Sequence, residues 1–162
     1  MNIKTKIALL EAGKWICVLL VAAFLISKCW SGKESTTEFE VMKEAVVAQA
    51  DVNLMQEADN QMVKRLYGLD PASFEGVLLY TPTTNMGSEE LLVIKLANLS
   101  QQETVVSAIE TRIATQMDSF EGYAQTQYEM LENAVIEVQG NYILFVSAAD
   151  PSPLRQAFLD TL

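Results

Sequence analysis

The stretch Ala134-Val-Ile-Glu-Val-Gln-Gly-Asn-Tyr-Ile-Leu-Phe-Val-Ser147 contains two apolar runs separated by Gly140-Asn141. Two residues of this type between strand-like runs predict a β-hairpin with a tight turn. A second pair of strands is expected at 76–81 and 90–97, joined by a loop that contains proline, asparagine and glycine. The chain is therefore expected to contain two antiparallel hairpins.

Helices are expected around these hairpins, because apolar residues recur there at helical spacing. The longest helix is expected to begin near Gln102, and its apolar stripe consists of Val106, Ile109, Ile113, Met117 and Phe120. Further helices are expected at 39–47, 56–67 and 127–131, and a last one after Pro151.

The order strand, strand, helix thus occurs twice, which favours an α+β fold. We expect a four-stranded antiparallel sheet, built from the two hairpins in the order ββα-ββα, with helices packed on it. Because both hairpins carry apolar residues on each side of their strands, the second face should also be covered. The two helices at 39–47 and 56–67 are the expected cover.

The N-terminal region carries a membrane-targeting pattern. Residues 15–26 form an uninterrupted apolar run behind Lys4, Lys6 and Lys14, which is typical of a signal peptide or signal anchor. Twelve residues are short for a bilayer span, but a helix over 7–27 has adequate length. We therefore divide the chain into a membrane segment (1–32), a linker (33–37) and an extracytoplasmic α+β domain (38–162).

Three modes of attachment stay open. The segment can remain as an uncleaved single-pass anchor, can be lipidated at Cys29, or can be removed so that the domain is secreted. Lys28 stands where a lipoprotein signal carries a small residue, and the sites for ordinary signal peptidase are poor. In each case we expect the C-terminal domain to lie outside the cytoplasm, at the cell membrane in the first two.

Composition excludes several kinds of site. Residues 33–162 contain seven basic and twenty acidic residues, a net charge of −13, which argues against binding to a nucleic-acid backbone. Cys17 and Cys29 are the only cysteines and the chain has no histidine, so the exported domain has no disulfide, no Cys/His metal site and no His-based triad. We expect no cofactor and no bound metal.

Candidate contact residues cluster around the second pair of strands. Lys95 interrupts an apolar strand and should seek a carboxylate, and Glu90 and Arg112 are expected to join it. The full candidate set is Tyr80, Asn85, Met86, Glu90, Lys95, Arg112 and Tyr123. A structural ion pair with aromatic packing, a ligand-binding pocket and a catalytic site are all compatible with these residues, and the polar loop 83–87 is a second candidate for partner contact.

Several of these residues form a pattern. The pattern consists of Tyr80-x-Pro82, Met86, Glu90-Leu-Leu-x-Ile-Lys95, Arg112, Gln116, Phe120, Tyr123 and Gly140-Asn-Tyr142. Over roughly residues 38–162 the chain resembles the bacterial family catalogued as domain of unknown function 4358. The resemblance implies an exported or lipoprotein-type protein of Gram-positive bacteria, and it implies no activity.

These observations favour a membrane-anchored, non-catalytic binding or accessory protein of the bacterial cell envelope, whose partner is an envelope protein or glycan. One alternative is a carboxylate-based hydrolase or transferase that acts on envelope polymers. The other is a structural subunit of a membrane complex.

Overall fold

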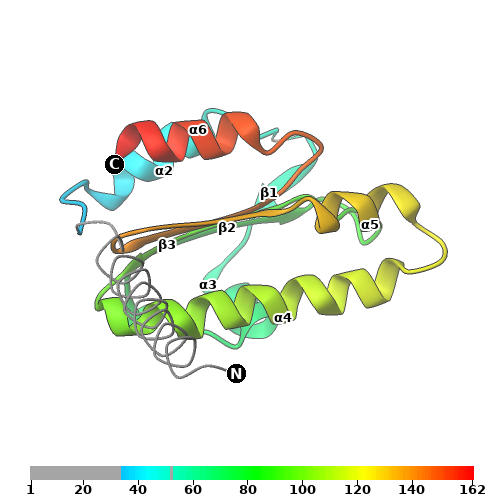
Figure 1. Cartoon of the computed structure of the whole chain (residues 1–162), viewed down its shortest axis with the longest axis horizontal. Helices are drawn as coiled ribbons and strands as arrows, with labels where there is room; N and C mark the ends of the chain where they lie inside the picture. The colour runs from blue at the N-terminus through cyan, green and yellow to red at the C-terminus, as the bar shows by residue number, and fades with distance from the viewer. Residues whose placement is uncertain (1–33, 52) are drawn as a thin grey trace, which may run out of the picture. The chain divides into compact units, whose positions relative to one another are not determined.

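The computed structural model describes residues 34–51 and 53–162, and the strands among them form a five-stranded antiparallel sheet (Figure 1). The strand order is β1-β2-β3-β5-β4. The strands are β1 (Met55–Glu57), β2 (Phe74–Pro82), β3 (Glu90–Leu96), β4 (Val135–Gln139) and β5 (Tyr142–Ser147). The expected α+β class is confirmed, and so are both hairpins. Gly140 has φ 57°, a left-handed conformation that glycine adopts without a steric penalty, so it suits the turn between β4 and β5.

Five α-helices and two short 3-10 helices are present in the described part of the chain. The α-helices are α2 (Phe39–Val47), α3 (Asn60–Tyr67), α4 (Gln102–Phe120), α5 (Gln125–Glu132) and α6 (Ser152–Thr161), and the 3-10 helices are Pro71–Ser73 and Leu99–Gln101.

The expected number of four strands is wrong, because a fifth strand, β1, extends the sheet. Met55 to Glu57 pair with Pro82 to Tyr80 of β2, in the region where we expected a helix to begin at residue 56. The helix begins at Asn60 instead, where the Asp59 carboxylate accepts a hydrogen bond from the Met62 backbone N–H at 2.9 Å. A three-residue edge strand is too short to produce a recognisable alternation of apolar and polar residues.

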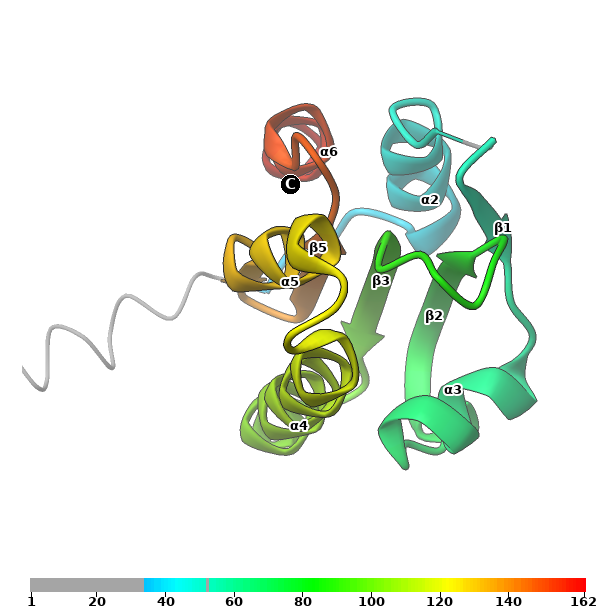
Figure 2. The ribbon, with the colours of Figure 1, turned by 90° about the vertical axis from the view of Figure 1, so that its right-hand side faces the viewer.

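Helices cover both faces of the sheet (Figure 2). On one face α2 and α6 pack over alternate strand residues, and that core includes Met42, Leu91, Val93, Tyr142 and Phe158. On the other face α3 and α4 pack over the intervening strand residues, and that core includes Val63, Leu92, Ile94, Ile109 and Phe145. The expectation that the first two helices share one face is therefore wrong, because β1 separates α2 from α3 and the chain reaches the opposite face before α3 begins.

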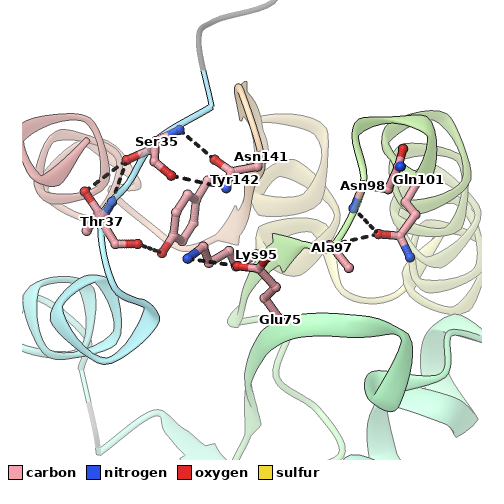
Figure 3. A network of polar contacts seen from close by, with 9 residues as sticks. All are labelled: Ser35, Thr37, Glu75, Lys95, Ala97, Asn98, Gln101, Asn141 and Tyr142. Atoms are coloured by element: carbon pink, nitrogen blue, oxygen red, sulfur yellow. Dashed lines mark hydrogen bonds and ion pairs between the residues drawn. The ribbon is translucent and has the colours of Figure 1, made fainter.

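Residues 35–37, which precede α2, form hydrogen bonds with the turn of the β4–β5 hairpin (Figure 3). The Ser35 backbone N–H donates to Asn141 Oδ1 at 2.8 Å, and the Tyr142 hydroxyl donates to the Thr37 carbonyl at 2.8 Å. The Thr37 hydroxyl also donates to the carbonyl of Thr161, at the end of α6, at 2.9 Å. Residues in the expected linker thus contact the domain.

The expected membrane segment (7–27) and the lipidation candidate Cys29 lie outside the described residues. Among the helices of residues 34–51 and 53–162, none combines the length and the apolar character that a membrane crossing requires.

Candidate functional site

The two faces of β3 separate the expected site residues into two groups. Side chains alternate along a strand, so Leu91, Val93 and Lys95 lie on the face that α2 and α6 cover, whereas Glu90 lies on the opposite face. Lys95 therefore does not join Glu90 and Arg112, and that part of the prediction is wrong. The pairing of Glu90 with Arg112 is present.

Glu90 is the centre of a buried polar network. It is 0 % exposed, and its two carboxylate oxygens accept four hydrogen bonds. Arg112 donates from Nη2 to Oε2 at 2.8 Å and from Nε to Oε1 at 3.3 Å, while Gln116 Nε2 donates to Oε2 at 3.1 Å. The Tyr67 hydroxyl donates to Oε1 at 2.5 Å. A buried carboxylate needs such partners, because an unpaired charge in an apolar interior is strongly unfavourable.

Three elements position this network. Glu90 is the first residue of β3, and Tyr67 is the last residue of α3, next to Gly68 in the left-handed conformation. Arg112 and Gln116 are four residues apart on α4, so they lie on the same side of that helix. Burial, and then the neighbouring Glu90 carboxylate, raise the pKa of Tyr67 well above its ordinary value. Tyr67 therefore remains a neutral hydrogen-bond donor at physiological pH.

A hollow of about 330 Å³ lies beside the network, between α3, α4 and the β2–β3 loop. Its lining residues are Gln56, Met62, Arg65, Leu66, Thr81, Pro82, Thr83, Thr84, Asn85, Gly87, Arg112, Gln116, Ser119 and Phe120. Two of these are arginines and none is acidic, in a domain that carries a large excess of negative charge. Arg112, whose side chain is 16 % exposed, belongs to both the buried network and the wall of the hollow.

A second hollow of about 550 Å³ adjoins the first. The two share Gln56, Met62, Arg65 and Thr81. The second hollow differs in charge, because Glu57 and Asp59 also line it. Together the two hollows form one candidate site, basic at its α4 end and mixed in charge at its β1 end.

The comparisons with known proteins match this region to one family. The sequence profile described as Domain of unknown function (DUF4358) matches residues 48–148, which is more than half of the chain. The chain belongs to the DUF4358 family. The match contains all five strands and helices α3 to α5, so it contains every residue that lines the two hollows. The curated proteins and the solved structures gave no match.

Within this DUF4358 region the structure brings only some of the expected site residues together. Arg112 and Asn85 line the smaller hollow, with Glu90 buried behind Arg112. Tyr80 is buried in the core under α2. The candidate Met86 is exposed, and Tyr123 is 64 % exposed with its ring centroid 6.1 Å from that of Phe120.

Sequence reasoning missed most of the residues that line the hollow. Arg65 lies on α3, where one charged residue on an exposed helix face carries no signal. Gln116 had two signals: it is part of the family pattern, and it follows Arg112 by one helical turn. Tyr67 was expected only as the end of a helix, because its contact with Glu90 joins residues that are 23 positions apart.

Lys95 forms a separate contact at the other end of the sheet (Figure 3). Its ammonium lies 2.9 Å from Glu75 Oε2 and 5.8 Å from the centre of the Tyr142 ring. Burial, and then the charge of Glu75, raise the pKa of Tyr142 to about 12. Tyr142 also donates a hydrogen bond to the Thr37 carbonyl. The contacts of Lys95, Glu75 and Tyr142 therefore help to hold residues 35–37, and none of the three lines the hollow.

Proposed function

We propose that this chain is a membrane-anchored, extracytoplasmic binding protein of the bacterial envelope, which holds its ligand in the hollow between α3, α4 and the β2–β3 loop. The observation that carries this proposal is Arg112, which lines the hollow while hydrogen bonds to the buried Glu90 hold its guanidinium in place. The apolar run at residues 15–26 and the family resemblance support the proposed location outside the cytoplasm at the membrane.

The chemistry of Glu90 favours binding over catalysis. A general acid or base must reach the proton that it transfers, either directly or through one water. Glu90 is fully buried, and its oxygens are already engaged by Tyr67, Arg112 and Gln116. The carboxylate is therefore suited to orienting Arg112, and not to attacking a substrate.

Site-specific photo-crosslinking in cells tests the binding role. A photoreactive residue at Asn85 lies on the hollow, whereas the same residue at Gln156, which is exposed on α6, serves as the matched control. We expect one discrete crosslinked product from the Asn85 position and none from the Gln156 position. Equal products from both positions, or no product together with turnover of envelope fragments by the purified protein, would contradict the proposal and favour the hydrolase.

A separate experiment tests the cellular location of the domain. Residues 33–162 contain no cysteine, so Gln156→Cys introduces a unique thiol into the domain. An impermeant maleimide applied to intact cells should label this variant if the domain lies outside the cytoplasm, and labelling only after lysis would refute that location. Metabolic labelling with a fatty acid that disappears in Cys29→Ser would identify the lipoprotein mode, and unlabelled full-length protein in the membrane would identify the anchor.

A further inference from the structure

We infer that the smaller hollow recognises a single carboxylate at the end of a glycan, with Arg65 and Arg112 as the residues that contact it; this inference rests on the proposed binding function and adds the chemical class of the ligand. Arginine presents a planar fork of N–H donors that matches the two oxygens of a carboxylate. The two arginines lie on different helices, α3 and α4, and both line this hollow.

The charge of the hollow favours a group with one negative charge. Glu90 already neutralises Arg112, whereas none of the ion pairs within residues 34–51 and 53–162 includes Arg65. The net local charge of the lining residues and Glu90 is therefore +1. A carboxylate balances this charge, but a phosphate monoester with nearly two negative charges would exceed it in a domain whose net charge is already −13.

The guanidinium of Arg112 is prepared for this contact. Nε and Nη2 donate to Glu90, so the plane of the group is fixed before a ligand arrives. The side chain lines the hollow and is 16 % exposed, so in this inference the donors that Glu90 does not engage contact the ligand. Fixing a donor in advance reduces the conformational entropy that binding would otherwise cost.

The uncharged lining suits hydroxyl groups. The hollow is also lined by seven neutral polar side chains: Gln56, Thr81, Thr83, Thr84, Asn85, Gln116 and Ser119. Gln116 donates its amide N–H to Glu90, and its Oε1 acceptor is buried without a hydrogen-bond partner in the described part of the chain. The other neutral side chains of this wall can exchange hydrogen bonds with sugar hydroxyls, whereas the buried Oε1 of Gln116 is closed to a ligand.

The adjoining hollow explains why the carboxylate is placed at an end of the ligand. Glu57 and Asp59 line that second hollow. Glu57 is paired with Lys43 at 2.9 Å, so the negative charge that would repel a carboxylate on the next sugar is that of Asp59. The two hollows share four residues, so a chain-like ligand can extend from one into the other. A neutral chain with one terminal carboxylate fits both hollows, whereas a polyuronate fits only the first.

Three matched probes test this inference. The first probe is a disaccharide with one uronate carboxylate, the second is the same disaccharide with that carboxylate reduced to the alcohol, and the third carries a phosphate ester instead. Each is titrated into the full-length protein in detergent micelles, while NMR follows the Nε–H signals of Arg65 and Arg112. We expect saturable shifts of both signals with the uronate, and binding at least tenfold weaker with the alcohol and with the phosphate ester.

Variants identify the contact residue. Arg65→Gln should weaken binding of the uronate at least tenfold, whereas Arg155→Gln, which removes an arginine from α6 on the opposite face, should leave it unchanged. Equal binding of uronate and alcohol, tighter binding of the phosphate ester, or an Arg65→Gln affinity equal to that of Arg155→Gln would each overturn the inference. A crosslinked product at Asn85 alongside any of these results would leave the proposed binding function standing, so the two failures are distinguishable.

Discussion

Replacement of Glu90 by alanine should destabilise the domain more than any other single loss of a carboxylate in its described part. The change removes a fully buried acceptor and leaves three donor groups behind, on Tyr67, Arg112 and Gln116. Removing one partner of a buried ion pair costs about 3–5 kcal/mol, since the other charge remains buried and unpaired. Arg112 retains some contact with solvent, so we expect the lower end of this range, about 3 kcal/mol.

Thermal unfolding of the full-length protein, followed by circular dichroism, measures this effect. For a domain of this size, a loss of about 3 kcal/mol lowers the melting temperature by roughly 10 °C. Glu89→Ala is the matched control, because it removes the same charge from the neighbouring residue, which is only half-buried. That control should change the free energy of unfolding by less than about 0.5 kcal/mol. If the melting temperatures of the two variants agree within about 2 °C, the buried network does not stabilise the fold and our reasoning is refuted.

Three further predictions concern other parts of the domain. Tyr67 and Tyr142 have pKa values raised above their unfolded value near 10, so their stabilising contribution is complete below pH 10 and is lost as the pH rises further. Above pH 10, each tyrosine should make the unfolding free energy fall by a further 1.4 kcal/mol or so per pH unit, about the value of one pKa unit. In urea titrations, Tyr142→Phe should abolish the part of this fall that Tyr142 causes between pH 10 and about 12. Gly76→Ala should cost about 1–3 kcal/mol because the added Cβ would overlap the ring of Phe39, and Phe39→Ala in the same chain should remove most of that penalty. Glu75→Ala breaks an ion pair between the largely buried Lys95 and a half-exposed carboxylate that solvent screens. Urea denaturation should therefore show a loss below about 1 kcal/mol, and a larger loss would contradict this screening.

The parts of the fold that could be predicted from the sequence are those determined by local patterns. Gly140-Asn141 between two apolar runs specified the β4–β5 hairpin, and the long apolar stripe specified α4. The edge strand β1 could not be predicted, because three residues carry no periodicity and their pairing depends on β2, more than twenty positions away. The assignment of α3 to a face also depends on tertiary packing, because an amphipathic helix packs equally well on either side of an apolar sheet.

The candidate site shows the same division between local and long-range information. Glu90 and Lys95 are five positions apart on one strand, so the alternation of side chains alone places them on opposite faces. The alternation rule could therefore have predicted that Glu90 and Lys95 do not contact each other, although we expected that they would. The contacts of Glu90 with Tyr67 and Arg112 span more than twenty positions and depend on how α3 and α4 pack, which no local pattern determines.

Arg112 connects the stability of the domain to its proposed binding site, so separate variants are needed for its two roles. Loss of ligand binding in an Arg112 variant has two explanations, since the same side chain neutralises buried Glu90 and lines the hollow. Arg65 is exposed, and none of the ion pairs within the described residues includes it, so its replacement should leave the melting temperature unchanged. A variant set that compares Arg65→Gln with Glu90→Ala therefore separates the two roles, because the first should lose ligand at constant stability and the second should lose stability first. If both variants lose ligand binding only in proportion to their loss of stability, the hollow does not bind a ligand through Arg65. The buried network then fully explains why Arg112 lies beside Glu90.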